Sequence, residues 1–192
     1  GPLASFVALA AMAATASMAA QVHVERVPDR GIQPKLATAA DGTLQLAYLT
    51  GDDKAADVRF ARRPAGSPTW GPRLQVNSQA GSALAVGTIR GADLAVGRDG
   101  WVHVVWNGSG TAAPRPTNSS PLLYTRLGPG ATAFEPQRNL IRQTRHLDGG
   151  GTVAADRAGQ VYVMWHGSGA DVPDGEENRT VYLARSTDDG RT

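Results

Sequence analysis

Two loops that begin alike carry side chains suited to ligand contact. Asn107 and His166 each follow a tryptophan, and each opens a segment that continues Gly-Ser-Gly. Where glycine removes the side chain, backbone amides can approach a ligand closely. The same composition also suits a connector that binds nothing, so the pattern by itself leaves both interpretations open.

The remaining residue types exclude several chemistries. The sequence has no cysteine, which excludes a disulfide framework, zinc ribbons and thiol catalysis. None of the four histidines shows an H-x-H or H-E-x-x-H spacing, and phosphate loops and the G-x-S-x-G motif are absent. We expect no cofactor and no metal, and the one combination left open is His166 with Glu176 and Glu177.

The charge balance of the sequence limits the classes of partner that the protein can bind. Lys and Arg total 19 and Asp and Glu total 17, a net charge of +2 that is too even for a nucleic-acid module. Lys35 and Lys54 are the only lysines, so 17 of the 19 basic residues are arginine. This bias indicates either carboxylate recognition by guanidinium groups or simply a GC-rich genome.

The first twenty residues are typical of a secretory signal. Residues 5–20 read SFVALAAMAATASMAA, an uncharged Ala-rich stretch that ends in small residues before a polar segment. The stretch is short for a membrane span. We therefore predict a signal peptide over 1–20, truncated at its start, and a secreted or periplasmic protein; a buried helix is the alternative.

A repeat organises the rest of the sequence. Residues 34–48, 92–106 and 151–165 align without gaps, and each copy has a short apolar run, a turn containing Gly42, Gly100 or Gly159, and an alternating run. Each alternating run closes with an aromatic residue. Gly turns between such runs predict β-hairpins.

Further strands complete each copy and predict the fold class. A third alternating run follows in every copy, and a short fourth run follows in the first two. Four antiparallel strands at a period near 60 residues indicate an all-β propeller, with a β-sandwich as the alternative. We predict a partial propeller over 21–192, with blades over about 31–78, 90–142 and 149–192. The other blades of an expected six would belong to a longer chain.

Propeller topology also predicts where a ligand would bind. The entry to strand one and the loop between strands two and three lie at the same end of a blade, so their polar residues should converge on one mouth. We expect a glycan or small molecule to bind there. The substrate-binding candidates are Gln33, Arg90, Asn107, Asp148, His166 and Arg179.

The last seven residues carry a family resemblance. Residues 186–192 read STDDGRT, which resembles the S-x-D-x-G-x-T Asp-box of sialidase-type (BNR-repeat) propellers. Degenerate copies at 63–70 and 127–134 keep a glycine and an aromatic residue but lack the aspartate. In such a turn the Asp side chain accepts hydrogen bonds from nearby backbone N–H groups, so we expect a folding motif.

The resemblance implies an activity and site residues. Members of the sialidase family carry an early arginine that binds the substrate carboxylate, and here that position is Ile32. Arg90 holds the same place in the second copy, where it either contacts a carboxylate or pairs with a neighbouring aspartate. The resemblance also places the general acid at Asp57, with Asp53 as an equal alternative; a solvated acidic loop is the other interpretation.

Two functions follow as expectations. One is a secreted exo-glycosidase acting on acidic glycans, and the other is a noncatalytic propeller that binds glycan or protein. Tyr48, Trp106 and Trp165 could stack on sugars, although their equivalent places in the repeat favour a structural role. His103 is expected to be a packing residue, because it occupies the place of Gln45 and Tyr162 in the other copies.

Overall fold

The described residues form three antiparallel sheets that follow one another along the chain. The computed structural model describes residues 22–86, 91–116, 119–173 and 175–192. The predicted signal peptide and Arg90 lie outside this part of the chain. Within it, no helix is long and apolar enough to cross a membrane.

Each sheet is built in chain order. The first has the order β1 (Ile32–Thr38), β2 (Leu44–Asp52), β3 (Ala55–Arg63) and β4 (Leu74–Gln75). The second has the order β5 (Asp93–Val96), β6 (Val102–Asn107), β7 (Leu122–Leu127) and β8 (Arg138–Asn139). The third has the order β11 (Arg179–Ser186), β10 (Val161–Gly169) and β9 (Thr144–Ala155). Three 3-10 turns interrupt the strands: η1 (Pro28–Arg30), η2 (Arg98–Gly100) and η3 (Glu176–Asn178).

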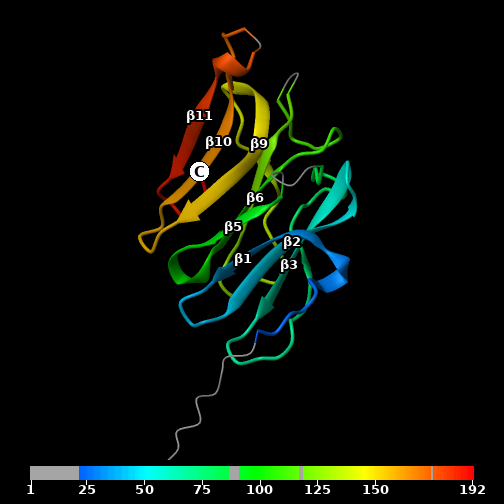
Figure 1. Ribbon diagram of the computed structural model, residues 1–192. Coiled ribbons are helices and arrows are strands. Elements are labelled where there is room, and N and C mark those ends of the chain that lie inside the picture. The colour runs from blue at the N-terminus through cyan, green and yellow to red at the C-terminus, as the bar shows by residue number, and fades with distance from the viewer. Residues whose placement is uncertain (1–21, 87–90, 117–118, 174) are drawn as a thin grey trace, which may run out of the picture.

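The sheets are arranged as the blades of a propeller. The innermost strands, β1, β5 and β9, are neighbours in space (Figure 1). The turns after these strands lie together on the left in Figure 1, and their glycines Gly42, Gly100 and Gly159 have φ of +81°, +85° and +86°. Glycine adopts this left-handed backbone without the steric cost that a side chain adds. The predicted all-β class and antiparallel blades are confirmed, with four strands in the first two sheets and three in the third, and the total blade number stays a prediction.

Apolar side chains of neighbouring sheets form two cores. The first core joins the first and second sheets through side chains such as Phe60 and Trp106, both about 1% exposed. The second joins the second and third sheets around Leu122 and Trp165. Tyr48 is fully buried beneath Gly31 and donates a hydrogen bond to Asp29. The three repeated aromatics are thus core residues, as their equivalent places favoured.

The third sheet begins earlier than the repeat indicated. Strand β9 starts at Thr144, ahead of the Gly151 that opens the aligned segment. The pairing of β9 with β10 shifts register on both sides of His166. This irregularity lets the strand extend past its counterparts, and it carries Asp148 beside His166.

The C-terminal turn is closed by one carboxylate. Asp188 accepts hydrogen bonds from the N–H groups of Arg191 and Thr192, both at 3.0 Å, and from the hydroxyl of Ser186 at 2.6 Å. The Ser186 hydroxyl and the Thr192 amide hold the pKa of Asp188 well below its usual range. These contacts are the local folding role that the sequence indicated for this aspartate.

Candidate functional site

The predicted mouth is the end of the sheets opposite the Gly turns. There the side chain of Gln33 donates to the Ala85 carbonyl at 3.0 Å, and the Ala85 amide donates to the Asp53 carbonyl at 2.7 Å. Gln33 has a φ of +51°, a conformation that non-glycine residues adopt only under constraint. The start of β1, the β2–β3 turn and the segment leading to β5 therefore form one connected rim.

Asp57 is a structural anchor of this rim. Its Oδ1 accepts hydrogen bonds from Asn77 Nδ2 at 2.9 Å and from the Gly81 amide at 2.8 Å. Burial raises the pKa of Asp57, but the hydrogen bonds from Asn77 and Gly81 outweigh it, and the pKa lies below its usual value. A general acid needs a raised pKa. The geometry therefore disfavours Asp57 in that role.

Asp53 has a different environment. It lies in the tight turn between β2 and β3 and is exposed. Its carbonyl is fixed by the Ala85 amide, while its carboxylate makes no hydrogen bond or ion pair within the described residues. Of the two acid candidates, Asp53 is the one whose carboxyl group is available to a ligand.

Asn107 ties two blades together. Its side-chain amide donates to the Gly149 carbonyl on β9, and its backbone carbonyl accepts from the Leu84 amide at 2.9 Å. The residue is only 2% exposed. It therefore positions the third sheet against the second, and its side chain offers a ligand little accessible surface.

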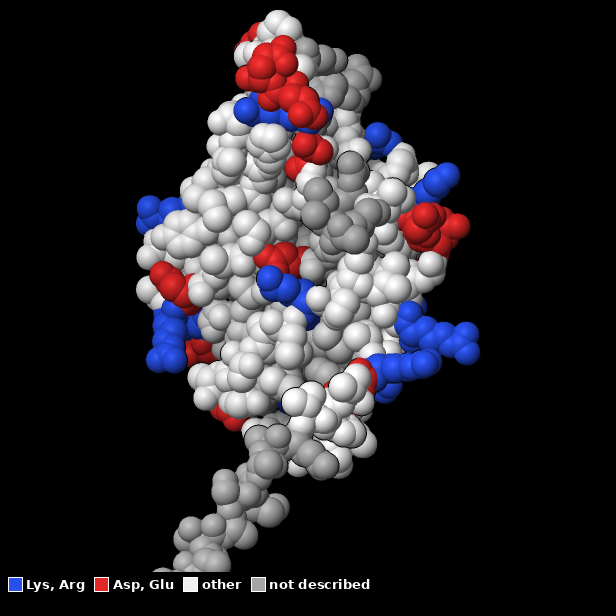
Figure 2. Space-filling model, viewed as in Figure 1, with Lys and Arg blue, Asp and Glu red and all other residues white. Residues whose placement is uncertain are grey.

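Three of the predicted binding residues do meet. Arg179 Nη1 lies 2.9 Å from Asp148 Oδ2, and His166 Nδ1 lies 3.7 Å from the same oxygen. Glu176, on the η3 turn before β11, takes a second contact of 2.9 Å from Arg179 Nη1. Figure 2 shows acidic and basic side chains gathered at this end of the molecule. We call Asp148, His166, Glu176 and Arg179 the rim cluster.

The rim cluster has more negative than positive charge, because two carboxylates face one guanidinium. One guanidinium serves two carboxylates, so the positive charge of Arg179 is already neutralised. His166 and Asp148 remain partly exposed, with side chains 44% and 40% accessible. Such paired groups can donate and accept hydrogen bonds at once, which suits neutral hydroxyl groups better than an isolated carboxylate.

A second charged contact holds the inner strands at the axis. Lys35 on β1 lies 2.9 Å from Asp93 Oδ1 on β5. Asp93 Oδ2 in turn accepts from the Thr152 hydroxyl at 2.6 Å and from the Val153 amide at 3.0 Å, both on β9. One buried carboxylate thus joins all three sheets, and its hydrogen bonds offset the cost of removing it from water.

Comparison with known proteins identifies the fold. No family model matches the sequence, and no curated protein matches it. In the solved structures, the Hadza microbial sialidase Hz136 is similar with a TM-score of 0.54 and 16% identity, over 83% of this chain and 36% of that protein. The fold is similar to that of part of a sialidase propeller. A mutant of NanB sialidase from Streptococcus pneumoniae is similar with a TM-score of 0.48 and 14% identity, over 77% of this chain and 20% of that one.

Two predictions about the mouth of this sialidase-type propeller have different outcomes. Arg90 lies outside the described residues, so its proposed carboxylate contact stays a prediction. Within the described residues, no group of three or more His, Asp or Glu side chains could hold a metal ion. His166, Glu176 and Glu177 therefore do not form the metal site that the sequence left open.

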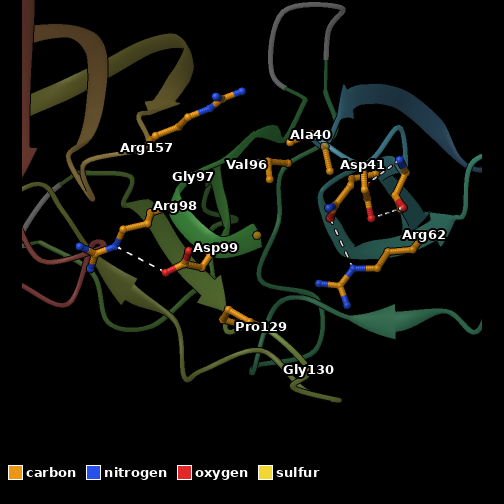
Figure 3. Close-up of a pocket in the computed structure, with 14 residues that line it drawn as sticks. Ala40, Asp41, Arg62, Val96, Gly97, Arg98, Asp99, Pro129, Gly130 and Arg157 are labelled. Atoms are coloured by element: carbon orange, nitrogen blue, oxygen red, sulfur yellow. Dashed lines mark hydrogen bonds and ion pairs between the residues drawn. The ribbon is translucent and has the colours of Figure 1, made fainter.

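A hollow at the opposite end was not foreseen from the sequence. It has a volume of about 650 Å³ and lies between the first and second blades, beside the Gly turns (Figure 3). Arg62, Arg98 and Arg157 line it, together with Asp41 and Asp99. The signal that could have revealed it is the degenerate turn at 127–134, which has no aspartate in the place of Asp189 of the third blade.

Proposed function

We propose that this chain belongs to an exported, sialidase-like propeller protein that binds glycans at its mouth. The observation that carries the proposal is the rim cluster, in which Asp148, His166 and Arg179 meet at the mouth end of a sialidase fold. The proposal assigns sugar hydroxyl groups to this cluster. It assigns the carboxylate of an acidic sugar to Arg90, which holds in the second copy the place where sialidases carry their arginine, whereas Lys35 and Arg179 already face carboxylates.

Loss of the rim arginine should weaken glycan binding. Arg179→Ala removes the partner of Asp148 and Glu176 and leaves two carboxylates facing each other, so we expect affinity for sialyllactose to fall about tenfold, the equivalent of about 1.4 kcal/mol. Calorimetry on the full-length protein measures this. Arg185→Gln, an exposed arginine at the far end of the same strand, is the matched control. Equal affinities for Arg179→Ala and wild type would contradict the role of the cluster.

The contribution of an acidic group is tested separately. Arg90→Ala should reduce affinity for sialyllactose and leave affinity for lactose, its neutral counterpart, unchanged. If Arg90→Ala leaves sialyllactose binding intact, Arg90 does not bind the sugar carboxylate. That result would not contradict the role of the rim cluster in binding sugar hydroxyl groups.

Glycoside hydrolysis is the second candidate function, and the exposed Asp53 favours it. In that reaction the Asp53 carboxyl group would protonate the leaving glycosidic oxygen, and the substrate carboxylate would be held without the arginine that Ile32 replaces. We expect Asp53→Asn to lower kcat for an aryl sialoside at least a hundredfold. Asp52→Asn, the neighbouring carboxylate, is the control. Unchanged turnover for both Asp53→Asn and Asp57→Asn would leave binding as the function.

The remaining blades are proposed partners of the third sheet. Val181 and Leu183 are 66% and 57% exposed and Met164 is 39% exposed, on the face turned away from the second core. Burying these side chains against a further blade would remove apolar surface from water. The chain spans 36% of the matched Hz136 sialidase, so whole-protein activity is part of the proposal.

A further inference from the structure

The junction between the second and third blades holds a carboxylate of the chain itself. Asp189, at the tip of the third-blade turn, is 8% exposed and forms an ion pair with Arg98 of the second blade. Its backbone carbonyl accepts a hydrogen bond of 2.8 Å from Arg126 Nη1 on β7. The turn of one blade therefore docks on two arginines of the blade before it.

The junction between the first and second blades has the same framework without that carboxylate. In the repeat, Arg62 takes the place of Arg126, because each is the next-to-last residue of its third strand, and Ala40 takes the place of Arg98. Gly130 takes the place of Asp189 when the third strands are aligned without a gap, and both residues have a positive φ in their turns, +72° and +56°. Both side chains of the Arg98–Asp189 pair are missing here. The hollow of about 650 Å³ lies at this point.

Arg62 lines the hollow, and part of its guanidinium N–H donors are not used in hydrogen bonds within the described residues. Its Nε donates to Gln45 Oε1 at 3.5 Å, and its guanidinium lies 5.4 Å from the centre of the Phe60 ring. Within the described residues, its two terminal nitrogens have no hydrogen-bond partner. Figure 3 shows the Arg62 guanidinium pointing into the open space beside Pro129 and Gly130.

The other walls add charge of both signs. Arg157 is exposed and forms no ion pair within the described part of the chain. Arg98 forms ion pairs with Asp99 and Asp189. Asp41 is occupied with the amide and hydroxyl of Thr43 in its own turn. Arg62 and Arg157 are therefore the cations of the hollow without an ion pair within the described residues, and the charge of Asp41 also acts on Arg62.

We propose that this hollow binds a small organic carboxylate, with Arg62 as the principal contact. A guanidinium matches a carboxylate in geometry and charge, and the contact strengthens where water is partly excluded. The volume is in the range of small-molecule sites. The protein already fills the equivalent place between its second and third blades with a carboxylate. The site lies at the end opposite the mouth, so it is independent of the proposed glycan site.

Succinate is a suitable probe, and succinamide is its neutral counterpart. Calorimetry on the full-length protein should show that succinate binds and succinamide does not. Arg62→Gln should weaken succinate binding tenfold or more, because it removes a charge-assisted contact. Arg185→Gln, which changes the equivalent arginine of the third blade outside the hollow, should leave the affinity unchanged.

A second variant guards against misfolding of the Arg62 variants. No atom lies within 4 Å of a Cβ built on Gly130, so Gly130→Asp can place a carboxylate where Asp189 stands in the next junction. We expect Gly130→Asp to abolish succinate binding while the far-ultraviolet circular dichroism stays that of wild type. Absence of succinate binding in wild type, or binding that survives both Arg62→Gln and Gly130→Asp, would overturn the proposal.

Discussion

Gly190→Ala is expected to destabilise the protein far more than the same change in the equivalent turn of the second blade. A Cβ on Gly190 would lie 1.9 Å from the Tyr124 hydroxyl, and Gly190 has a φ of +71°. Tyr124 has little freedom to move aside, because it is 3% exposed and its hydroxyl is hydrogen-bonded to His103 Nδ1 at 2.7 Å. The backbone cost of about 1 kcal/mol and the overpacking cost of about 1–3 kcal/mol add to a loss of about 2–4 kcal/mol.

Gly130→Ala supplies the matched control. Gly130 has nearly the same φ, +72°, but a Cβ there meets nothing within 4 Å. It should lose only the backbone term, about 1 kcal/mol. Urea unfolding of the two variants, with m-values compared to wild type, separates the docking clash from the turn conformation. Equal losses in the two variants would show that the third-blade turn does not dock on Tyr124.

A double variant tests the cause of the clash directly. Tyr124→Phe removes the hydroxyl oxygen that a Cβ on Gly190 would strike. If the clash dominates, Gly190→Ala should cost less in the Tyr124→Phe background than in wild type, because the two sites are in contact and their effects are not additive. Additive losses would place the cost of Gly190→Ala elsewhere in the turn.

The blade architecture could be predicted from the sequence because its signals are local. Turn glycines such as Gly42 and Gly100 need a left-handed backbone, and alternating runs beside them pair by register. The burial of Trp106 follows from its place in such a run. Each of these inferences depends on residues close together in the chain, where spacing alone decides the geometry.

The functions of individual polar residues were harder to predict because they depend on contacts between blades. Asp57 and Asp53 are four residues apart and looked equivalent, yet Asn77 and Gly81 fix one and leave the other exposed. Spacing cannot say which polar side chain a neighbouring loop will meet. The hollow beside Arg62 was harder still, because it results from side chains that are absent.

His103 gives the second large expected effect, a loss of stability between pH 6.5 and pH 4. The side chain is fully buried, and burial, aided by the nearby charge of Arg126, lowers its pKa from 6.5 to about 4. The charges of Arg138, Asp189 and Glu135 also face it, with the two carboxylates opposing the shift. His103 is therefore neutral in the folded protein at pH 7.

The sign of the effect follows from proton linkage. Between the unfolded pKa of 6.5 and the folded pKa of about 4, the unfolded chain binds a proton at His103 that the folded protein does not. The free energy of unfolding therefore falls as the pH falls through this window, by about 3 kcal/mol at most for a shift of this size. Carboxylates with lowered pKa, such as Asp57 and Asp188, lose their contribution below their usual value of 3.8, so the two windows are distinct.

His103→Gln isolates this contribution. Gln45 occupies the equivalent place in the first blade and is 4% exposed there, so glutamine is a side chain that this position of the fold accommodates. Urea unfolding of wild type and His103→Gln at pH 7, 6, 5 and 4.5 should give a slope with pH for wild type and a much flatter line for the variant. Parallel curves would assign the acid lability to other groups. A flat line for His103→Gln would establish that the acid sensitivity arises where the third-blade turn meets the second blade, since His103 and Tyr124 lie beneath Gly190.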